Sequence, residues 1–185
     1  KAIQVKLDNI SKGYVDDLEI GGRNYLKGSA KFDSGNWFTN NASYVSVESS
    51  DENGINQVKH IGNGYLAQST SIIGFDFSDT SQTFTISVYA KCETSGTIGL
   101  TLSANHLNFQ PKTLTNEWAK YTWTFKGIGS NLLGFRFNIS SATEENPIYI
   151  KKPAIFLGNK ATDWTPAPED VEANIETAKT EAESA

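Results

Sequence analysis

Thr83–Lys91 (TFTISVYAK) is the stretch of sequence that decides the expected fold. Apolar and polar residues alternate along it, which is typical of a β-strand that buries one face. The apolar positions are Phe84, Ile86, Val88 and Ala90. The polar positions are Thr85, Ser87, Tyr89 and Lys91. A strand with one apolar face indicates a sheet that packs against a second layer.

Other parts of the chain continue this pattern. The same alternation returns in three later segments, residues 97–103, 119–125 and 134–139. A last strand is predicted over residues 148–157, where Pro153 indicates a sheet edge or a bulge because proline cannot donate a backbone hydrogen bond. Short strands joined by Gly, Asn and Ser turns, without βαβ alternation, predict an all-β fold, a jelly-roll β-sandwich over residues 24–159.

Helical segments are expected on both sides of this domain. Residues 1–20 carry a heptad seam, formed by Ile3, Leu7, Ile10, Tyr14 and Leu18. Residues 171–185 repeat the spacing with smaller side chains, Val171, Ile175, Ala178 and Ala182. Between domain and tail, residues 160–170 (KATDWTPAPED) contain two prolines that resist helix formation, so they predict a hinge. The segments are either parts of a coiled coil or two frayed ends, because isolated helices of this length are marginal in water.

Composition limits the classes of function. The chain has 185 residues, a net charge of −5 and no Met, and it begins with Lys1, so we expect a piece of a longer polypeptide. Clustered Lys and Arg, the signature of nucleic-acid binding, are not evident, and the acidic balance also argues against an anionic membrane surface. No run approaches the roughly 18 apolar residues of a membrane-spanning helix.

The residues that usually carry catalysis or hold metals give little signal. The single cysteine, Cys92, and the two distant histidines, His60 and His106, form no metal-ligand spacing, so we expect no metal and no cofactor. Nucleophile-elbow, zinc-protease, phosphate-loop and dinucleotide motifs are absent. Carboxylates lie mostly in turn-like segments, whereas a glycosidase needs two that face each other across a cleft. We therefore expect no enzymatic activity, and a glycan-degrading enzyme is the third hypothesis.

The polar strand faces favour carbohydrate binding. Aromatic rings cover the C–H patches of sugars, while amides, hydroxyls and Arg bond to their hydroxyl groups. We expect a contact set composed of Tyr89, His106, Asn108, Phe109, Arg136 and Asn138, with Trp37 as an outside candidate. The alternative is an ordinary solvated sheet face. Trp123 is expected in the core, and Trp164 is expected to pack the hinge against the domain.

Several motifs resemble a known family. Asn24-Tyr25-Leu26 with residues 32–37 (FDSGNW) resembles the opening of jelly-roll carbohydrate-binding modules. Residues 83–91 resemble their internal strand, and residues 116–125 resemble their later Trp-containing strand. The flanks, residues 20–24 and 158–170, resemble those of such modules in tail-tip, baseplate and fibre proteins of phages that infect Gram-positive bacteria.

This resemblance implies a function and its partners. The implied protein is a non-catalytic module of a phage tail, located on the virion, that adheres to host cell-wall or capsular polysaccharide. It implies a homotrimer formed through the flanking helices, contacts with other tail proteins, and no insertion into a membrane. The alternative is a structural spacer that makes protein contacts only. Related enzyme-attached modules often hold calcium with an Asp in the last strand, whereas residues 147–153 (PIYIKKP) contain lysines, which oppose a cation there.

Overall fold

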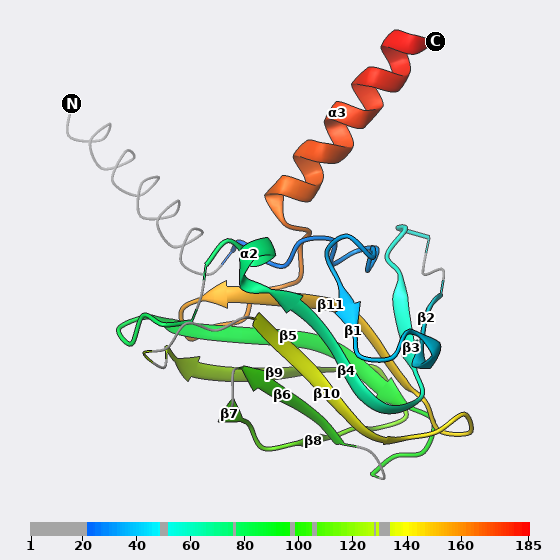
Figure 1. The fold of residues 1–185 in the computed structure, drawn as a ribbon, viewed down its shortest axis with the longest axis vertical. Helices are drawn as coiled ribbons and strands as arrows, with labels where there is room; N and C mark the ends of the chain where they lie inside the picture. The colour runs from blue at the N-terminus through cyan, green and yellow to red at the C-terminus, as the bar shows by residue number, and fades with distance from the viewer. Residues whose placement is uncertain are drawn as a thin grey trace, which may run out of the picture.

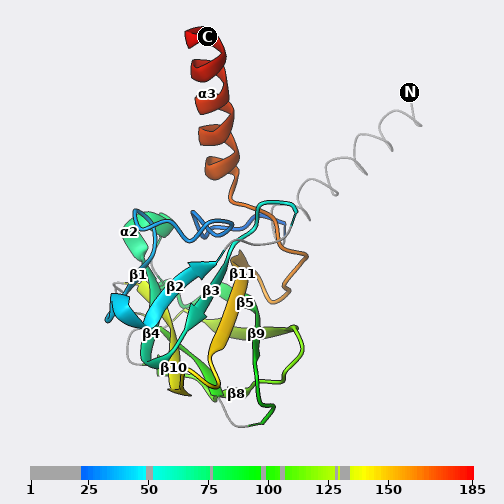
Figure 2. The ribbon, with the colours of Figure 1, turned by 90° about the vertical axis from the view of Figure 1, so that its right-hand side faces the viewer.

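The computed structural model describes residues 22–48, 52–75, 77–96, 99–104, 107–127, 129 and 134–185 (Figure 1). The predicted helix over residues 1–20 lies outside these ranges. The described chain forms two antiparallel sheets, and Figure 2 shows them from the side as two layers. The predicted all-β jelly-roll sandwich is confirmed. Within the described residues, no helix has both the length and the apolar composition needed to cross a membrane.

One layer, sheet A, has the strand order β1-β4-β10-β6-β7, and β8 also pairs with β6. Its strands are β1 (Phe38–Thr39), β4 (Gly62–Ser69), β6 (Gly99–Ala104), β7 (Leu107–Asn108), β8 (Lys112–Thr113) and β10 (Gly134–Ala142). The other layer, sheet B, has the order β2-β3-β11-β5-β9. Its strands are β2 (Val45–Glu48), β3 (Gln57–His60), β5 (Thr83–Cys92), β9 (Ala119–Lys126) and β11 (Ile148–Leu157).

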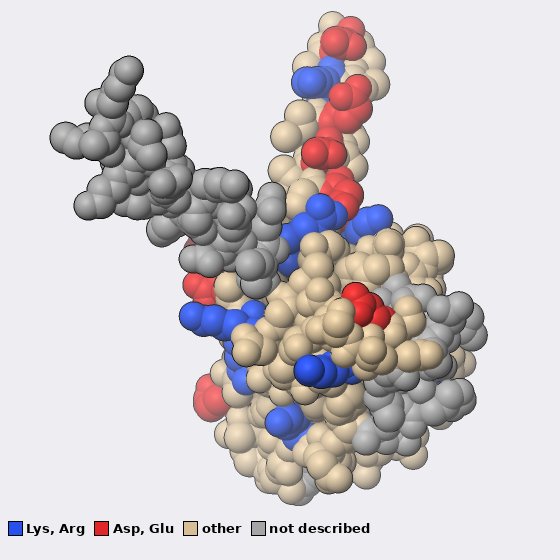
Figure 3. All heavy atoms as spheres, turned by 90° about the vertical axis from the view of Figure 1, so that its left-hand side faces the viewer, with Lys and Arg blue, Asp and Glu red and all other residues tan. Residues whose placement is uncertain are grey.

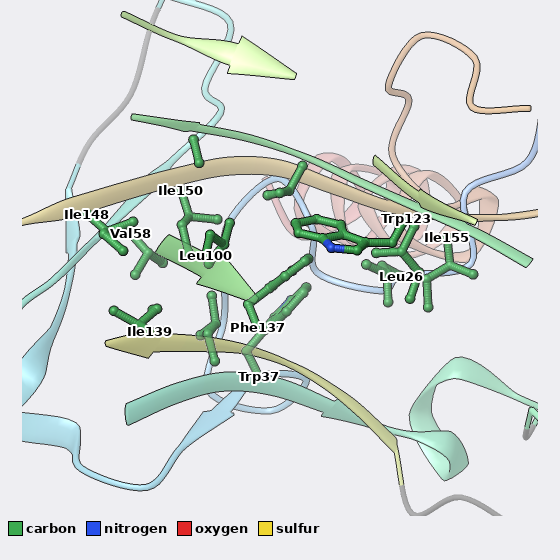
Figure 4. Packing of buried hydrophobic residues seen from close by; sticks show 14 of the residues in the cluster. Leu26, Trp37, Val58, Leu100, Trp123, Phe137, Ile139, Ile148, Ile150 and Ile155 are labelled. Carbon is green, nitrogen blue, oxygen red and sulfur yellow. The ribbon is translucent and has the colours of Figure 1, made fainter. Parts of the chain in front are cut away.

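The core lies between the layers, where the apolar positions of both sheets meet. Trp123 of β9 and Phe137 of β10 point toward each other from opposite sheets, with ring centroids 6.2 Å apart (Figure 4). The four apolar positions of the β5 motif, Phe84, Ile86, Val88 and Ala90, are all buried. The predicted alternation therefore places the correct residues in the core, Trp123 included.

Pro153 marks a bulge in β11. The pairing of β11 with β5 shifts register between Lys151 and Ala154, while β11 stays a central strand of sheet B. Lys152, which precedes the proline, has a φ of 52°, in the left-handed backbone region that residues other than glycine rarely adopt. Of the two expected settings for this proline, the bulge is therefore the one that the structure shows.

A buried asparagine fixes the segments before and after the sandwich. Asn24 is fully buried, and its amide nitrogen donates to the carbonyl oxygens of Pro153 (3.2 Å) and Thr165 (2.9 Å). Its amide oxygen accepts from the backbone N–H groups of Leu26 (3.0 Å) and Ile155 (3.1 Å). This one side chain thus ties the start of the domain to β11 and to the segment that follows it.

Further contacts hold the base of the last helix, α3 (Pro168–Ser184). As expected, Trp164 packs against the domain, and its ring N–H donates to the Pro153 carbonyl oxygen at 3.1 Å. Arg23 pairs with Glu169 at the first turn of α3. The helix then projects from the body (Figures 1 and 2), and Val171 and Ile175 are 41% and 53% exposed. The short helices η1 (Ala42–Tyr44) and α2 (Thr70–Ile73) connect strands.

Candidate functional site

The structure divides the predicted contact set between opposite sides of the sandwich. Arg136 and Asn138 lie on β10 in sheet A, where they alternate with the buried residues Phe137 and Ile139. Tyr89 lies on β5 in sheet B. Since both sets point away from the core, they occupy opposite outer faces. The expectation that these residues share one face is therefore wrong: a period of two separates inner from outer positions but does not say which sheet a strand joins.

The other predicted contact residues have different settings. Phe109 is half-buried, and its ring packs on Phe125 with centroids 5.0 Å apart. Trp37 is 5% exposed, and its ring N–H donates to the Lys27 carbonyl oxygen at 3.0 Å. Both rings therefore serve the core. Asn108 belongs to β7, but its side chain, like the whole of His106, lies outside the described part of the molecule.

Arg136 has two aromatic neighbours on the outer face of sheet A. Its guanidinium carbon lies 5.1 Å from the centroid of the Tyr65 ring, a cation–π arrangement. Phe38 meets the same Tyr65 ring edge to face, with centroids 6.2 Å apart, and is 45% exposed. Asn138 stands opposite Tyr65 in the strand register, and Thr101 stands opposite Asn138 on β6. We call these five residues, Phe38, Tyr65, Thr101, Arg136 and Asn138, the sheet A strip.

Strand register explains how the strip forms. Phe38 on β1 and Arg136 on β10 both pair with Ala67, which lies between them on β4. Because alanine is small, both longer side chains can lie over it and reach the neighbouring Tyr65. Beside Tyr65, a Cβ atom at Gly64 would lie 2.6 Å from the Asn40 side-chain oxygen, which accepts the Tyr65 backbone N–H at 2.9 Å. A side chain at this position would therefore displace the Asn40 amide from its hydrogen bond with the strand.

Two residues of the strip were missed by the sequence-based prediction. Phe38 follows the core residue Trp37, so alternation alone places it on the outside. Tyr65 follows Gly62-Asn63-Gly64, whose composition favours a turn, yet these residues begin β4. The sequence signal that could have identified Phe38 is its place directly after Trp37, because alternation puts one of these two rings on the outer face.

An apolar depression of about 180 Å³ adjoins the strip through Phe38. Val47, which is 47% exposed, lines it together with the core residues Trp37, Val58 and Leu66. The depression lies where β1 of sheet A comes near β2 and β3 of sheet B. It offers room for a small apolar group next to the strip.

The strip lacks the acid–base groups that glycoside hydrolysis needs. The described strands of sheet A contain no Asp or Glu, whereas glycoside hydrolysis requires two facing carboxyl groups. Across the residues that the structure describes, no three His, Cys, Asp or Glu side chains converge as metal ligands.

Perturbed titrating groups are found away from the strip. Burial lowers the pKa of His60 below its usual 6.5. Burial also raises the pKa of the Cys92 thiol and of the Asp170 carboxyl, which accepts the Gly28 backbone N–H at 2.9 Å. His60 and Cys92 lie in the core and Asp170 lies at the base of α3, so these groups have structural roles.

Comparisons with known proteins bear on the fold. No protein-family model matches the chain, and no curated protein matches it. Among solved structures, the CBM22-1 xylan-binding domain from Paenibacillus barcinonensis has a TM-score of 0.50 and 14% identity, over 75% of this chain and 94% of that one. The CBM22-1–CBM22-2 tandem domain from the same organism has a TM-score of 0.53 and 15% identity, over 77% of this chain and 47% of that one.

A viral protein shares the fold as well. The enzymatically active domain of tailspike protein 4 from bacteriophage CBA120 has a TM-score of 0.50 and 15% identity, over 75% of this chain and 22% of that one. At such identities the likeness concerns the fold alone. The chain has the jelly-roll β-sandwich fold found in carbohydrate-binding modules.

Proposed function

We propose that this chain is a non-catalytic carbohydrate-binding module and that the sheet A strip contacts the glycan. The observation that carries the proposal is the grouping of the exposed residues Phe38 and Arg136 with the half-buried Tyr65 on one sheet face. Sugar rings present C–H patches to aromatic faces and hydroxyl groups to amides and guanidinium groups. The strip offers both kinds of partner side by side.

The geometry of the strip supports one mode of binding. Strands lie about 4.8 Å apart, so the distance from β1 across β4 and β10 to β6 is about 15 Å. A short run of sugars can lie across these strands, with Phe38 and Tyr65 under their rings and Asn138 and Thr101 bonding to hydroxyl groups. Because the Tyr65 ring already holds Arg136, little side-chain freedom is lost when a sugar binds. The apolar depression beside Phe38 suits a methyl or acetyl substituent at one end.

The biological setting that we propose is adhesion by a phage tail. The fold is shared with a xylan-binding domain and with part of a phage tailspike, and both likenesses support the proposal. In this setting the module binds host cell-surface polysaccharide from the virion and contacts other tail proteins. The exposed Val171 and Ile175 on α3 supply the seam of a coiled-coil trimer. Three copies gain avidity through effective concentration, so weak binding by each module is sufficient.

Binding measurements on variants test the proposal. The full chain is titrated with neutral cell-wall polysaccharides, and Tyr65→Ala and Arg136→Ala are each compared with Thr122→Ala, an exposed change on sheet B. We expect each strip variant to lose about tenfold or more in affinity, the size of one stacking or charged hydrogen-bond contact. The control is expected to bind as the unchanged protein does. Equal binding by all three variants would exclude the strip as the surface that contacts the glycan.

A spacer role is the second candidate. Phe38 and Val47, both large and nearly half exposed, flank the same depression, which also suits a protein contact. If the module serves as a spacer, Phe38→Ser abolishes binding to a tail-protein partner, and no polysaccharide binds the unchanged chain.

For the trimer, sedimentation of the double variant Val171→Asp/Ile175→Asp is expected to show a monomer under conditions where the unchanged chain is trimeric.

A further inference from the structure

The outer face of sheet B is rich in lysine although the chain is acidic overall. The described strands of sheet B contain six Lys and one acidic residue, Glu48, in a chain whose net charge is −5. Five of these lysines are half-buried, Lys59, Lys91, Lys120, Lys151 and Lys152, and the last two together with Lys91 contact aromatic rings. Together with Tyr89, Trp118 and Tyr149 we call them the lysine face. This face is on the opposite side of the sandwich from the sheet A strip.

Strand register arranges the lysine face in rows. Across β3, β11 and β5, one row has the order Lys59, Tyr149, Lys91. Across β11, β5 and β9, the next row has the order Lys151, Tyr89, Lys120. Each row therefore alternates cation, aromatic and cation. Because the two lysines of a row are two strands apart, their Cα atoms are about 10 Å apart.

Aromatic rings hold the ammonium groups in place. The Lys151 ammonium nitrogen lies 4.1 Å from the centroid of the Trp118 ring. That of Lys91 lies 5.1 Å from the Tyr149 ring and 5.7 Å from Trp118. Lysine ordered by a cation–π contact has less side-chain entropy to lose when an anion binds. The face is therefore preorganised for anions, unlike a face of unrestrained lysines.

The bulge in β11 adds a fifth cation to this face. Successive residues of a strand normally point to opposite faces. Because of the register shift and the φ of 52° at Lys152, its ammonium lies 5.9 Å from the Tyr89 ring and 6.0 Å from the Trp164 ring. Lys152 thus lies on the same side as Lys151. A left-handed conformation is unfavourable for a non-glycine residue, and the following proline restricts Lys152 further.

Acidic residues limit the lysine face on one side. The pKa of Tyr149 is raised by burial first, then by a hydrogen bond to Glu93 and by the charges of Glu93 and Glu48. At the same side, a hollow of about 130 Å³ is lined by Lys59, Ser46 and Glu144. Lys91, Lys120 and the two lysines at the bulge lie on β5, β9 and β11, which are farther than Lys59 from β2, the strand that carries Glu48.

We propose that the lysine face is a second binding surface, specific for an anionic glycan that carries phosphate or carboxylate groups. A flat face with regularly spaced cations matches an extended polymer whose charges are spaced along it. The acidic side chains along α3 and the net charge of −5 oppose a densely charged polymer such as nucleic acid (Figure 3). The inference rests on the proposed function only in taking the ligand to be a glycan, because the two surfaces share no residue.

Binding to defined polymers tests this inference on the full chain. The probes are polygalacturonate for carboxylate, poly(ribitol phosphate) for phosphate, neutral dextran, and a single-stranded DNA of equal charge. The test variant is Lys91→Gln/Lys151→Gln, and the matched control, Lys31→Gln/Lys179→Gln, removes the same charge from exposed sites elsewhere. We expect the test variant to lose about tenfold in affinity for at least one anionic glycan, with a weaker salt dependence. Lys91→Arg/Lys151→Arg is expected to keep the binding.

A second variant separates binding from folding. Lys152→Asn removes a charge and places a residue that accepts the left-handed conformation at the bulge. We expect its melting temperature to be unchanged or higher while anionic-glycan binding falls about threefold. Equal losses in the test and control variants, no binding to either anionic glycan, or tighter binding to the DNA would each overturn the inference. Substitutions in the sheet A strip are expected to leave binding to the anionic glycans unchanged. Failure of the proposal for one surface is therefore distinguishable from failure of the proposal for the other.

Discussion

Replacing Asn24 by alanine is expected to destabilise the domain strongly, because this side chain serves several buried backbone groups at once. Its five hydrogen bonds, at 2.9 to 3.2 Å, reach the Ser29 hydroxyl, the Pro153 and Thr165 carbonyls, and the Leu26 and Ile155 N–H groups. A buried hydrogen bond contributes about 1 kcal/mol net, and a buried group left without a partner costs about 1–3 kcal/mol. Since the bonds share one side chain, we expect a total loss of about 3–5 kcal/mol.

Urea unfolding, followed by the fluorescence of the four tryptophans, measures this loss. The matched control is Asn36→Ala, an amide at a more accessible site that bonds to the nearby Asp33 carboxylate, where we expect less than about 1 kcal/mol. Limited proteolysis gives a second readout, because loss of the Thr165 contact exposes the chain between β11 and α3. A loss below about 1.5 kcal/mol for Asn24→Ala, or a loss equal to that of the control, would refute the reasoning.

Three further changes follow from the same structure. Because burial lowers the pKa of His60 below 6.5, this histidine binds a proton more readily in the unfolded chain than in the folded one. The stability that neutral His60 contributes is therefore present above about pH 6.5 and is lost as the pH falls toward the folded pKa. His60→Leu should remove this dependence in urea unfolding at pH 5 and 8. Trp164→Phe loses the hydrogen bond to Pro153, and we expect about 1 kcal/mol in the same assay. Phe137→Ala empties a fully buried site, and calorimetry should show a loss of about 3–5 kcal/mol.

The sequence allowed the central strands to be predicted because their alternation is strong. The motif over residues 83–91 corresponds to β5, Thr83–Cys92, and the segment over residues 119–125 corresponds to β9, Ala119–Lys126. The first four strands were not predicted. β1 and β2 are short, with only two and four residues, and β4 begins with glycines that favour a turn. Pairing with neighbouring strands overrides such local preferences.

The candidate site was harder to predict than the fold. Arg136 and Asn138 were correctly placed on an outer face, but the sequence does not show that β10 joins sheet A while β5 joins sheet B. Tyr89 was therefore grouped with residues that lie across the sandwich from it. Phe38 and Tyr65 join the strip through pairing between β1, β4 and β10, which are far apart along the chain. Long-range register of this kind leaves no local pattern.

A heteronuclear NMR titration tests the central claim most directly. The ¹⁵N-labelled chain is titrated with the neutral oligosaccharide that it binds most tightly, and the shifted backbone signals are mapped on both sheets. The account predicts shifts concentrated at Phe38, Tyr65, Arg136 and Asn138, with the outer face of sheet B unchanged. Shifts concentrated on sheet B or at the base of α3, with the strip unaffected, would contradict it.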